Sequence, residues 1–259
     1  MSTMSTPASQ PPFPKHPERI LEKRLRRNFA AGVRELSLIS RGDHILIGLS
    51  GGKDSLALLE LLGDARRRSG KSFELTALHV RMASIDYRSD TAYLEEQAAA
   101  AGVPLLVKTA AFEPDRKEGR SPCFLCSWTR RKVLFDVAQE LGCNKIALGH
   151  HQDDLLLTAL MNLTFAGSFA TMPAALQMRK FPVTLIRPLC KVAEEDLKAW
   201  AALRQYRPLE KVCPYDKTSN RTAIRQLFET MQRLNPEARH SLWHALQKEG
   251  KLTEYSHEP

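Results

Sequence analysis

An α/β fold with a mostly parallel sheet is predicted by two features of this sequence. The first is the alternation of short apolar runs with longer segments whose apolar residues recur at helical spacing, which is typical of βαβ units. The second is that glycine-rich and charged segments follow several of these short runs directly, as ligand loops do in such sheets. The strands are expected at residues 44–49, 73–80, 103–108, 145–148 and 183–186.

The helices are expected before, between and after these strands. In the first helix Ile20, Leu25 and Phe29 recur at the spacing of one helical face. The predicted helices cover residues 18–40, 54–68, 91–101, 124–141, 151–165, 193–204, 219–234 and 236–248. The segments 112–122 and 167–182 are expected to be a loop and an irregular stretch, because both contain glycine and proline.

Three regions are expected along the 259 residues. Residues 1–17 are rich in serine, threonine and proline and are predicted to form a disordered tail. Residues 18–190 are predicted to form the α/β domain with its N-terminal helix, and residues 191–259 a helical C-terminal region. No apolar run approaches the roughly 20 residues that span a bilayer, and the tail lacks the apolar segment of a signal peptide. We therefore expect no membrane association and a cytoplasmic location.

The formal net charge of +9 and a pI of about 9.4 favour polyanionic partners such as nucleic acid. Basic residues gather in three clusters, at 19–27, 66–68 and 130–132. Because charged runs on helices are commonly solvated faces, the clusters alone leave both interpretations open.

The segment Ser50-Gly51-Gly52-Lys53-Asp54-Ser55 lies between a predicted strand and a predicted helix. Two glycines allow the backbone to turn tightly and approach an anion, and the N–H groups that begin the next helix point toward it. A lysine and two hydroxyls add donors, so the chemistry suits phosphate. The spacing is not that of a Walker A loop. The alternative is an ordinary Gly-Gly turn that caps a helix.

This hexapeptide resembles the signature of the PP-loop pyrophosphatases, the N-type ATP pyrophosphatases. The segment 149–154, Gly-His-His-Gln-Asp-Asp, is similar to the family's second segment, Gly-His-x-x-Asp-Asp. The resemblance implies a Rossmann-like domain of the adenine nucleotide alpha hydrolase kind over residues 18–190. It also implies that ATP is cut to AMP and pyrophosphate while an oxygen of the substrate is adenylated.

The resemblance implies roles for individual residues as well. The residues that it implies for ATP binding are Ser50, Gly51, Gly52, Lys53, Asp54, Ser55, His79, Val80 and Gly149. Those that it implies for catalysis are Lys53, Asp54, Asp153 and Asp154. The carboxylates would assist Mg²⁺ and phosphate positioning, since Mg²⁺ prefers oxygen ligands. The alternative for Asp153 and Asp154 is a first-turn pair that complements the helix dipole.

Five cysteines and no secretory signal argue against a disulfide framework. Cys123 and Cys126 form a Cys-x-x-Cys pair that suits zinc, a redox pair or an iron–sulfur cluster. Cys213 is the best candidate for a third ligand. Cys143 and Cys190 have apolar neighbours and are expected in the core.

The chain from about Glu22 to Leu246 resembles, within the PP-loop family, the branch that makes 2-thiocytidine in tRNA (the TtcA type). The matching stretches are 50–55, 123–126 with Arg130-Arg131, 149–154, 161–163 with Gly167, 172–173, 186–189 and Cys213. The resemblance implies a [4Fe–4S] cluster held by Cys123, Cys126 and Cys213, with one iron open to sulfide. The chain departs from the pattern at Asp216, where relatives usually have a second cysteine.

The same resemblance implies the substrate and the partners. The substrate would be tRNA, at cytidine 32 of the anticodon loop, and sulfur would come from a cysteine desulfurase or another sulfide source. A homodimer is possible. The alternatives are a thiolase for another tRNA base, a PP-loop ligase of the tRNA lysidine synthetase type, which needs no cysteines, and a zinc- or cluster-containing RNA-binding protein that has lost ATP chemistry.

Overall fold

The computed structural model describes residues 16–83, 86–87, 91–111, 122–209, 211–212 and 220–254. The helices are α1 (Pro17–Glu35), α2 (Lys53–Arg68), α3 (Ala92–Ala101), α4 (Pro122–Glu140), α5 (Gln152–Ala166), α6 (Glu194–Leu203), α7 (Asn220–Leu234) and α8 (Ala238–Lys248). The strands are β1 (His44–Gly48), β2 (Glu74–Met82), β3 (Asp86–Tyr87), β4 (Leu105–Ala110), β5 (Lys145–Ala147), β6 (Ala175–Gln177), β7 (Thr184–Ile186), β8 (Lys211–Val212) and β9 (Thr253–Glu254). Residues 1–15 of the predicted tail lie outside the described residues.

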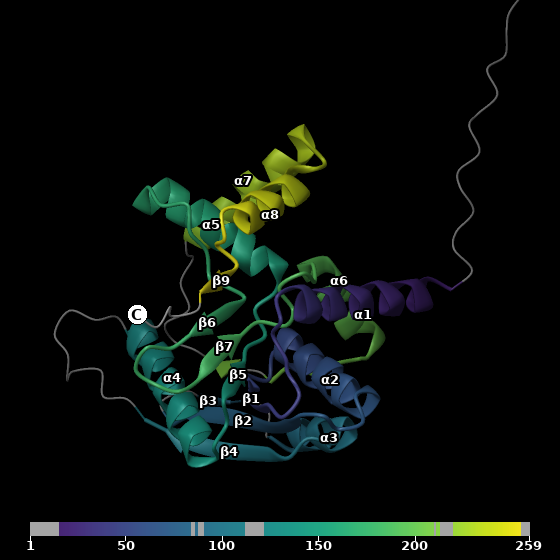
Figure 1. Ribbon diagram of the computed structural model, residues 1–259, viewed down its shortest axis with the longest axis vertical. Coiled ribbons are helices and arrows are strands. Elements are labelled where there is room, and N and C mark those ends of the chain that lie inside the picture. Colours follow the sequence, from purple (N-terminus) through teal and green to yellow (C-terminus); the bar gives the residue numbers. More distant parts are fainter. Residues whose placement is uncertain are drawn as a thin grey trace, which may run out of the picture.

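The described residues form a seven-stranded sheet in the order β4-β2-β1-β5-β7-β6-β9 (Figure 1). The strands from β4 to β7 in this order are parallel, and β6 is antiparallel to β7. From β1 the chain first proceeds to β2 and β4, and then returns to the other side of β1 for β5 and β7. Because ligands bind where the strand order reverses, the loops after β1 and β5 mark the expected site.

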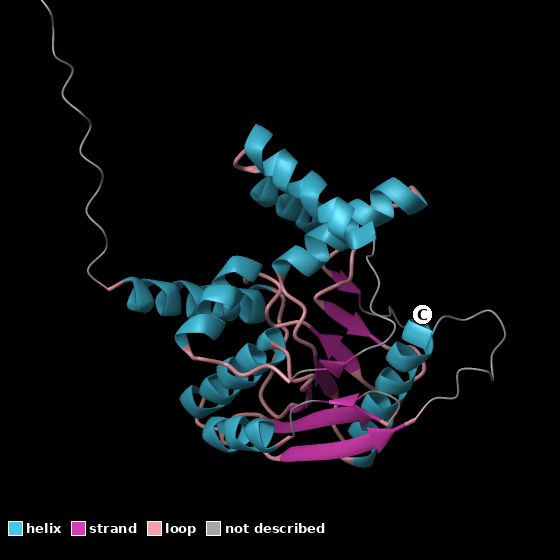
Figure 2. Ribbon diagram, turned by 180° about the vertical axis from the view of Figure 1, so that it is seen from behind, coloured by secondary structure: helices cyan, strands magenta, loops and turns pink. Residues whose placement is uncertain are grey.

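Helices cover both faces of this sheet (Figures 1 and 2). Helix α4 packs against β1, β2, β4 and β5, whereas α2 packs on the other face with α3 and α6 beside it. Successive residues of β1 point to opposite faces and so divide the interior in two. Ile45 and Ile47 belong to the larger core, and Leu46 belongs to a smaller core with Phe135 of α4. The predicted α/β architecture is therefore confirmed.

The C-terminal helices α7 and α8 contact each other and α5, and Figure 1 shows the three gathered at one end of the molecule. Helix α6 packs against α1 and α2, and β9 adds a strand next to β6. The division into regions 18–190 and 191–259 stays a prediction. None of the helices in the described ranges is long and apolar enough to cross a bilayer.

Several boundaries differ from the predicted ones for local reasons. Helix α1 ends at Glu35, short of residue 40, because Ser37 adopts a positive φ of 50°. Strand β2 continues to Met82 because it pairs with β4 as far as Ala110. Helix α4 begins within the predicted loop, at Pro122, where a proline is compatible with the first helical position.

The predicted irregular stretch 167–182 contains β6. This strand has three residues, and its order comes from pairing with β7 and β9 rather than from a local pattern of its own. Strands β3 and β8 are shorter still, and they form a separate antiparallel pair. Strands this short carry little periodicity in sequence, and they exist because distant segments meet.

Candidate active site

The phosphate-loop candidate 50–55 joins β1 to α2, as the sequence predicted. Gly51 has a φ of +82°, a conformation that glycine adopts without steric cost. Gly52 is the N-cap of α2 and makes no side-chain cap, so the first N–H groups of the helix lack that usual partner. These groups and the positive end of the helix dipole form an anion site.

The two serines of the loop hold its shape. The Ser50 hydroxyl accepts from the Gly52 N–H at 3.3 Å and lies 3.1 Å from the Ser55 hydroxyl. The Ser55 hydroxyl in turn donates to the Gly52 carbonyl at 2.9 Å. Because both side chains bond within the loop, they fix the backbone whose N–H groups face the anion.

The second predicted segment, 149–154, meets this loop directly. A Cβ atom on Gly149 would lie 3.1 Å from the Ser55 nitrogen and 3.3 Å from the Asp54 carbonyl oxygen. The residue must therefore be small for the loops after β1 and β5 to touch. Two segments about a hundred residues apart in sequence thus form one site at the point where the strand order reverses.

Lys53 and Asp54 lie at the first turn of α2. The Lys53 ammonium is 3.0 Å from Asp54 Oδ2 and 3.9 Å from Glu194 Oε1. Asp54 Oδ1 is buried and accepts no hydrogen bond from the described residues. A buried carboxylate oxygen with unused capacity fits a Mg²⁺ that arrives with a nucleotide.

Asp153 and Asp154 are both tied by hydrogen bonds. Asp153 accepts from the Arg239 guanidinium at 2.6 Å and from the Glu194 N–H at 2.8 Å. Burial acts to raise the pKa of Asp153, but these two bonds outweigh it and the pKa falls. Asp154 accepts from the His151 N–H at 2.9 Å and from the Arg221 guanidinium. Asp154 thus caps α5, and Asp153 binds the first N–H of α6. Both lie in the first turn of α5, which is the arrangement that the dipole alternative predicts.

An apolar cavity of about 130 Å³ lies at the carboxyl ends of β1, β2 and β5. It is lined by Gly48, Leu49, Ser50, Leu78, Val80, Arg130, Leu134 and Leu148. Val80, which the resemblance implied for ATP binding, is in the wall of this cavity. His79 points to the other face and its Nδ1 contacts the Leu49 carbonyl at 2.8 Å, so it supports the loop from behind.

Cys123 and Cys126 lie in the first turns of α4, three residues apart and therefore on one face of the helix. Cys123 is exposed and Cys126 is half-buried. Cys126 precedes Arg130 by one helical turn, and Arg130 lines the apolar cavity. Cys126 and Arg130 are thus about 6 Å apart along the helix axis.

The sequence predicted core positions for Cys143 and Cys190 and a ligand role for Cys213. Burial raises the pKa of the Cys143 thiol to about 11 and that of Cys190 to about 12. Both belong to the apolar cores, and the predicted core positions are confirmed. Cys213 lies outside the described residues, and within the described ranges no group of three metal-binding side chains occurs.

Comparison with known proteins identifies the family. The PP-loop domain matches residues 20–231, which is most of the chain. The chain belongs to the PP-loop family. A tRNA-cytidine(32) 2-sulfurtransferase of Anaeromyxobacter sp. (strain K) is 34% identical over 232 residues, covering 87% of this chain and 79% of the relative. One of Verminephrobacter eiseniae (strain EF01-2) is 36% identical, covering 88% of this chain and 73% of the relative.

A solved structure supports the fold. The U34-tRNA thiolase NcsA from Methanococcus maripaludis, determined with its [4Fe-4S] cluster, superposes with a TM-score of 0.75 at 23% identity. The superposition covers 92% of this chain and 82% of that one. The family and the fold that the sequence predicted are therefore confirmed.

Sequence reasoning missed one residue that shapes the PP-loop. The Leu209 N–H donates to the Gly51 carbonyl at 2.8 Å, and a Cβ on Gly51 would lie 2.6 Å from the Leu209 Cβ. Leu209 is held over the loop by the preceding residues, because the Tyr206 hydroxyl donates to Glu60 of α2 at 2.6 Å. No local pattern marks Leu209, and only the fold brings it to the PP-loop.

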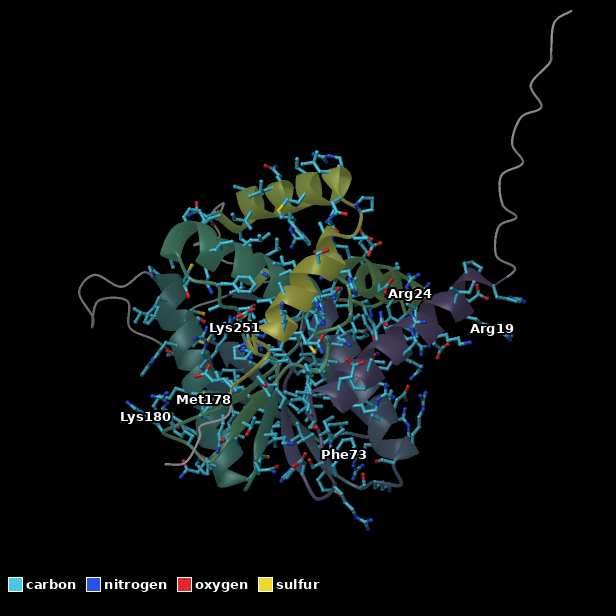
Figure 3. All side chains as sticks on the ribbon, turned by 45° about the horizontal axis from the view of Figure 1, so that its top comes forward. Arg19, Arg24, Phe73, Met178, Lys180 and Lys251 are labelled. Carbon is cyan, nitrogen blue, oxygen red and sulfur yellow. The ribbon has the colours of Figure 1, made fainter. Side chains whose placement is uncertain are left out.

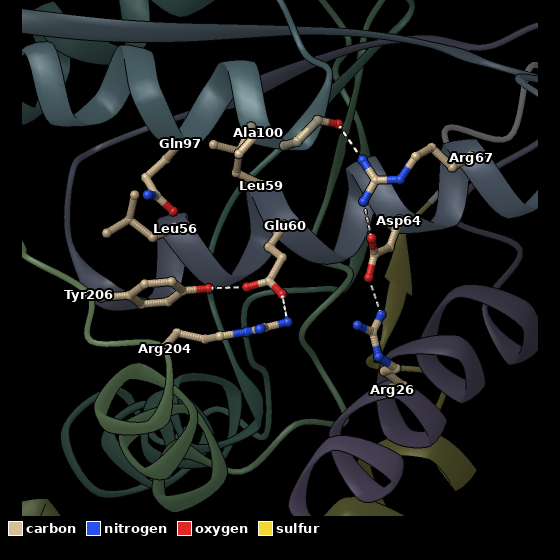
Figure 4. Close-up of a pocket in the computed structure, with 11 residues that line it drawn as sticks. Arg26, Leu56, Leu59, Glu60, Asp64, Arg67, Gln97, Ala100, Arg204 and Tyr206 are labelled. Atoms are coloured by element: carbon tan, nitrogen blue, oxygen red, sulfur yellow. Dashed lines mark hydrogen bonds and ion pairs between the residues drawn. The ribbon is translucent and has the colours of Figure 1, made fainter. Parts of the chain in front are cut away.

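Figure 4 shows the pocket of about 280 Å³ in which Tyr206 and Glu60 meet. Asp64 of α2 lies in the same pocket and pairs with Arg26 of α1 and Arg67. The carboxylates of Glu60 and Asp64 are bonded to cations or hydroxyls of neighbouring elements. We therefore interpret the pocket as a place where these elements are held together, with a structural role.

A second missed contact joins His150, which is half-buried, to Arg187, which is buried. Arg187 Nε lies 3.3 Å from His150 Nδ1. Burial, followed by the charge of Arg187, lowers the pKa of His150 to about 4. The imidazole is therefore neutral at physiological pH, with Nδ1 as the acceptor and its proton on Nε2.

Proposed function

We propose that this chain is an ATP-dependent tRNA sulfurtransferase that adenylates O2 of cytidine 32 and replaces that oxygen with sulfur. The observation that carries this proposal is the placement of two chemistries on one helix. Helix α4 presents Cys123 and Cys126 at its start, and one turn later Arg130 lines the cavity beside the PP-loop. The identity to the two sulfurtransferases over more than 85% of the chain supports the same activity.

The reaction has two steps, and each conserves its atoms. The O2 atom of the base attacks the α-phosphorus of ATP, and pyrophosphate leaves. Sulfide then attacks C2, the C2–O2 bond breaks, and AMP leaves with the former base oxygen. Adenylation is needed because a carbonyl oxygen is a poor leaving group by itself.

The PP-loop supplies the first step. The N–H groups at the start of α2 and the Lys53 ammonium stabilise charge that develops on the phosphates. Asp54, with its buried Oδ1, is placed to accept Mg²⁺ bound to those phosphates. Asp153 and Asp154 are the other two carboxylates that we assign to this step. The apolar cavity at Val80 suits the adenine ring.

The cysteines supply the sulfur site. Thiolates are the protein ligands of iron–sulfur clusters, and an accessible pair one turn apart fits two positions of such a cluster. We assign Cys123, Cys126 and Cys213 as the three ligands of a [4Fe–4S] cluster. When bound, a cluster with one iron free of protein ligands would hold sulfide for the second step.

The basic surface suits tRNA. Arg19, Lys23 and Arg27 of α1 are exposed, and Figure 3 shows Arg19 near the end of this helix. Arg24, from the same helix, is instead engaged by Asp196 at 3.0 Å. Contacts of exposed cations with the phosphate backbone position RNA without reading its sequence. We further propose a cytoplasmic enzyme, a cysteine desulfurase or other sulfide source as partner, and assembly as a homodimer.

The test is an anaerobic assay of the reconstituted protein with ATP, sulfide and a tRNA that carries cytidine 32. We expect 2-thiocytidine, AMP and pyrophosphate in equal amounts, measured by nucleoside mass spectrometry and chromatography. The same tRNA with uridine at position 32 is the matched control, and it should stay unmodified. Thiolation at a different base would reassign the substrate, whereas AMP release that depends on lysine and not on sulfide would indicate a lysidine-type ligase.

A further inference from the structure

Three arginines from α7 and α8 reach the carboxylates around the PP-loop. Arg221 pairs with Asp154, Arg225 pairs with Glu194, and Arg239 pairs with Asp153 at 2.6 Å. A sequence-local interpretation would not connect these residues, because the arginines follow the carboxylates by 67, 31 and 86 positions.

The three arginines differ in how firmly they are held. Arg239 also bonds Gln152 at 3.2 Å, and its guanidinium lies 5.4 Å from the centre of the Phe228 ring. Its side chain is only 25% exposed, whereas those of Arg221 and Arg225 are 37% and 36% exposed. Arg221 and Arg225 are four residues apart and so share one face of α7.

Glu194 connects Arg225 to the PP-loop. One of its carboxylate oxygens bonds Arg225 and the other lies 3.9 Å from the Lys53 ammonium. Asp154 pairs with Arg221 from the first turn of α5, five residues after Gly149, which contacts the loop. Arg225 is thus one carboxylate away from Lys53, and Arg221 lies one turn away from Arg225 on α7.

We propose that Arg221 and Arg225 are ligands of the pyrophosphate end of ATP, and that Asp154 and Glu194 hold their places until the nucleotide arrives. The planar guanidinium fork matches phosphate oxygens with two parallel hydrogen bonds. When Mg²⁺ enters with ATP and engages the acidic residues, the arginines lose a partner, and the β- and γ-phosphates replace it. The exchange keeps every cation paired both before and after binding.

The arrangement also accounts for the place of α7. The guanidinium groups of Arg221 and Arg225 are partly exposed, so their ion pairs add little to stability and the two cations are accessible to a ligand. A cationic cluster beyond the PP-loop favours the triphosphate over the monophosphate. Pyrophosphate leaves the same cluster after the first step, so Arg221 and Arg225 stabilise charge on the leaving group.

The experiment measures binding in the absence of tRNA. The purified protein with Mg²⁺ is titrated calorimetrically with α,β-methylene-ATP, which cannot be cut, with pyrophosphate and with AMP. For Arg221→Gln and Arg225→Gln we expect the Kd of the ATP analogue and of pyrophosphate to rise about tenfold each. The Kd of AMP should stay within twofold of the wild-type value, because AMP lacks the β- and γ-phosphates.

Arg233→Gln is the matched control, since Arg233 lies on the same helix and bonds only Thr230 among the contacts described. It should bind all three ligands as the wild type does. Arg225→Lys keeps the charge and should recover part of the affinity, which keeps the test valid if Arg225→Gln lowers the Tm. Unchanged affinity for the ATP analogue overturns the proposal. An equal loss for AMP also overturns it, because that result indicates a structural role.

This inference rests on the proposed function only through ATP as the nucleotide. The titrations use neither tRNA nor sulfide. Absence of thiolation with intact selective loss of ATP affinity would therefore refute the sulfurtransferase proposal and leave the arginine ligands standing. Normal thiolation, together with arginine variants that lose affinity for AMP as much as for the ATP analogue, would refute the arginine ligands and leave the sulfurtransferase proposal standing.

Discussion

The nucleotide site and the cysteine site of this protein are built in opposite ways. The loop 50–55 is held by its own serines, by Gly149 from the loop after β5 and by Leu209 from the segment after α6. The cysteine pair lies at the exposed start of a helix. A phosphate site works by pre-oriented N–H groups and must be rigid, whereas a metal site is completed by the metal that its thiolates bind.

The two sites nevertheless share α4. Its start carries Cys123 and Cys126, and its next turn places Arg130 at the cavity beside Ser50. Arg130 Nε is buried and has no hydrogen-bond partner among the described residues, so this helix side chain has capacity for a ligand of the cavity. The difference in construction therefore predicts that each site can be removed without the other, although they serve one reaction.

The largest effect is expected when the two sites are removed separately. Lys53→Ala should lower AMP formation roughly 10²- to 10³-fold, because one preorganised donor to the reacting phosphate is lost. Iron content should stay at the wild-type value. Cys126→Ala should abolish thiolation and iron retention, whereas its Kd for the ATP analogue should stay within twofold of the wild-type value.

The measurements are iron and sulfide analysis, calorimetric titration and the tRNA assay on the same preparations. Lys132→Ala is the control on α4, since Lys132 pairs only with Asp136 one turn away among the contacts described. Loss of iron in the Lys53 variant, or loss of nucleotide binding in the Cys126 variant, would show that the two sites form a single folding unit.

A smaller effect is expected from Gly51→Ala. The substitution places an L-residue at a φ of +82°, which costs roughly 1–2 kcal/mol, and its methyl group would meet Leu209 at 2.6 Å. We expect the Kd for the ATP analogue to rise about tenfold or more, because a displaced loop no longer aims its N–H groups. Iron content should not change.

Gly42→Ala separates the two causes, since Gly42 has a φ of +86° but no neighbour within 4 Å of an added Cβ. Gly42→Ala should lower the free energy of unfolding by about as much as the backbone strain in Gly51→Ala does, and it should leave nucleotide binding intact. The double variant Gly51→Ala, Leu209→Ala should recover part of the affinity. If the double variant binds no better than Gly51→Ala, the contact with Leu209 does not shape the loop.

The sequence predicts the strands of the parallel core, both nucleotide loops and the core cysteines because each has a local signature. Ile45, Leu46 and Ile47 form a buried run, and Gly51 and Gly149 stand where the backbone approaches closely. Leu209 and Arg225 have no such signature, since a leucine before a loop and an arginine on an amphipathic helix are common everywhere. Their roles exist only once α6 and α7 fold back on the loop.

The same distinction holds for the carboxylates that we propose as catalytic. Spacing alone does not separate a helix-capping Asp154 from a magnesium ligand, and the structure shows that it also accepts from His151 and Arg221. Likewise the third cysteine ligand, Cys213, stays a prediction because it lies outside the described residues. Sites that are built from several segments of the chain are therefore the hardest to predict from local sequence patterns.

The smallest effect on activity is expected from Cys143 and Cys190, the two core cysteines. Their substitution tests whether the cysteine site excludes them. Burial raises the pKa of Cys143 to about 11 and of Cys190 to about 12, so both thiols stay protonated and shielded at pH 8. Iodoacetamide at that pH should modify neither of them in the folded protein, because the thiolate is the reactive form. Peptide mass spectrometry measures the modification, and guanidinium-unfolded protein, in which all cysteines react, is the control.

Cys143→Ala and Cys190→Ala should accordingly retain full iron and full thiolation. Each removes a buried sulfur from a packed core, and Cys190 lies where a Cβ on Gly32 would approach its Sγ within 3.1 Å. We expect each variant to lose about 1 kcal/mol of unfolding free energy, from urea denaturation. Loss of iron in either variant would mean that a core cysteine takes part in the cluster, and the assignment of Cys123, Cys126 and Cys213 would then be wrong.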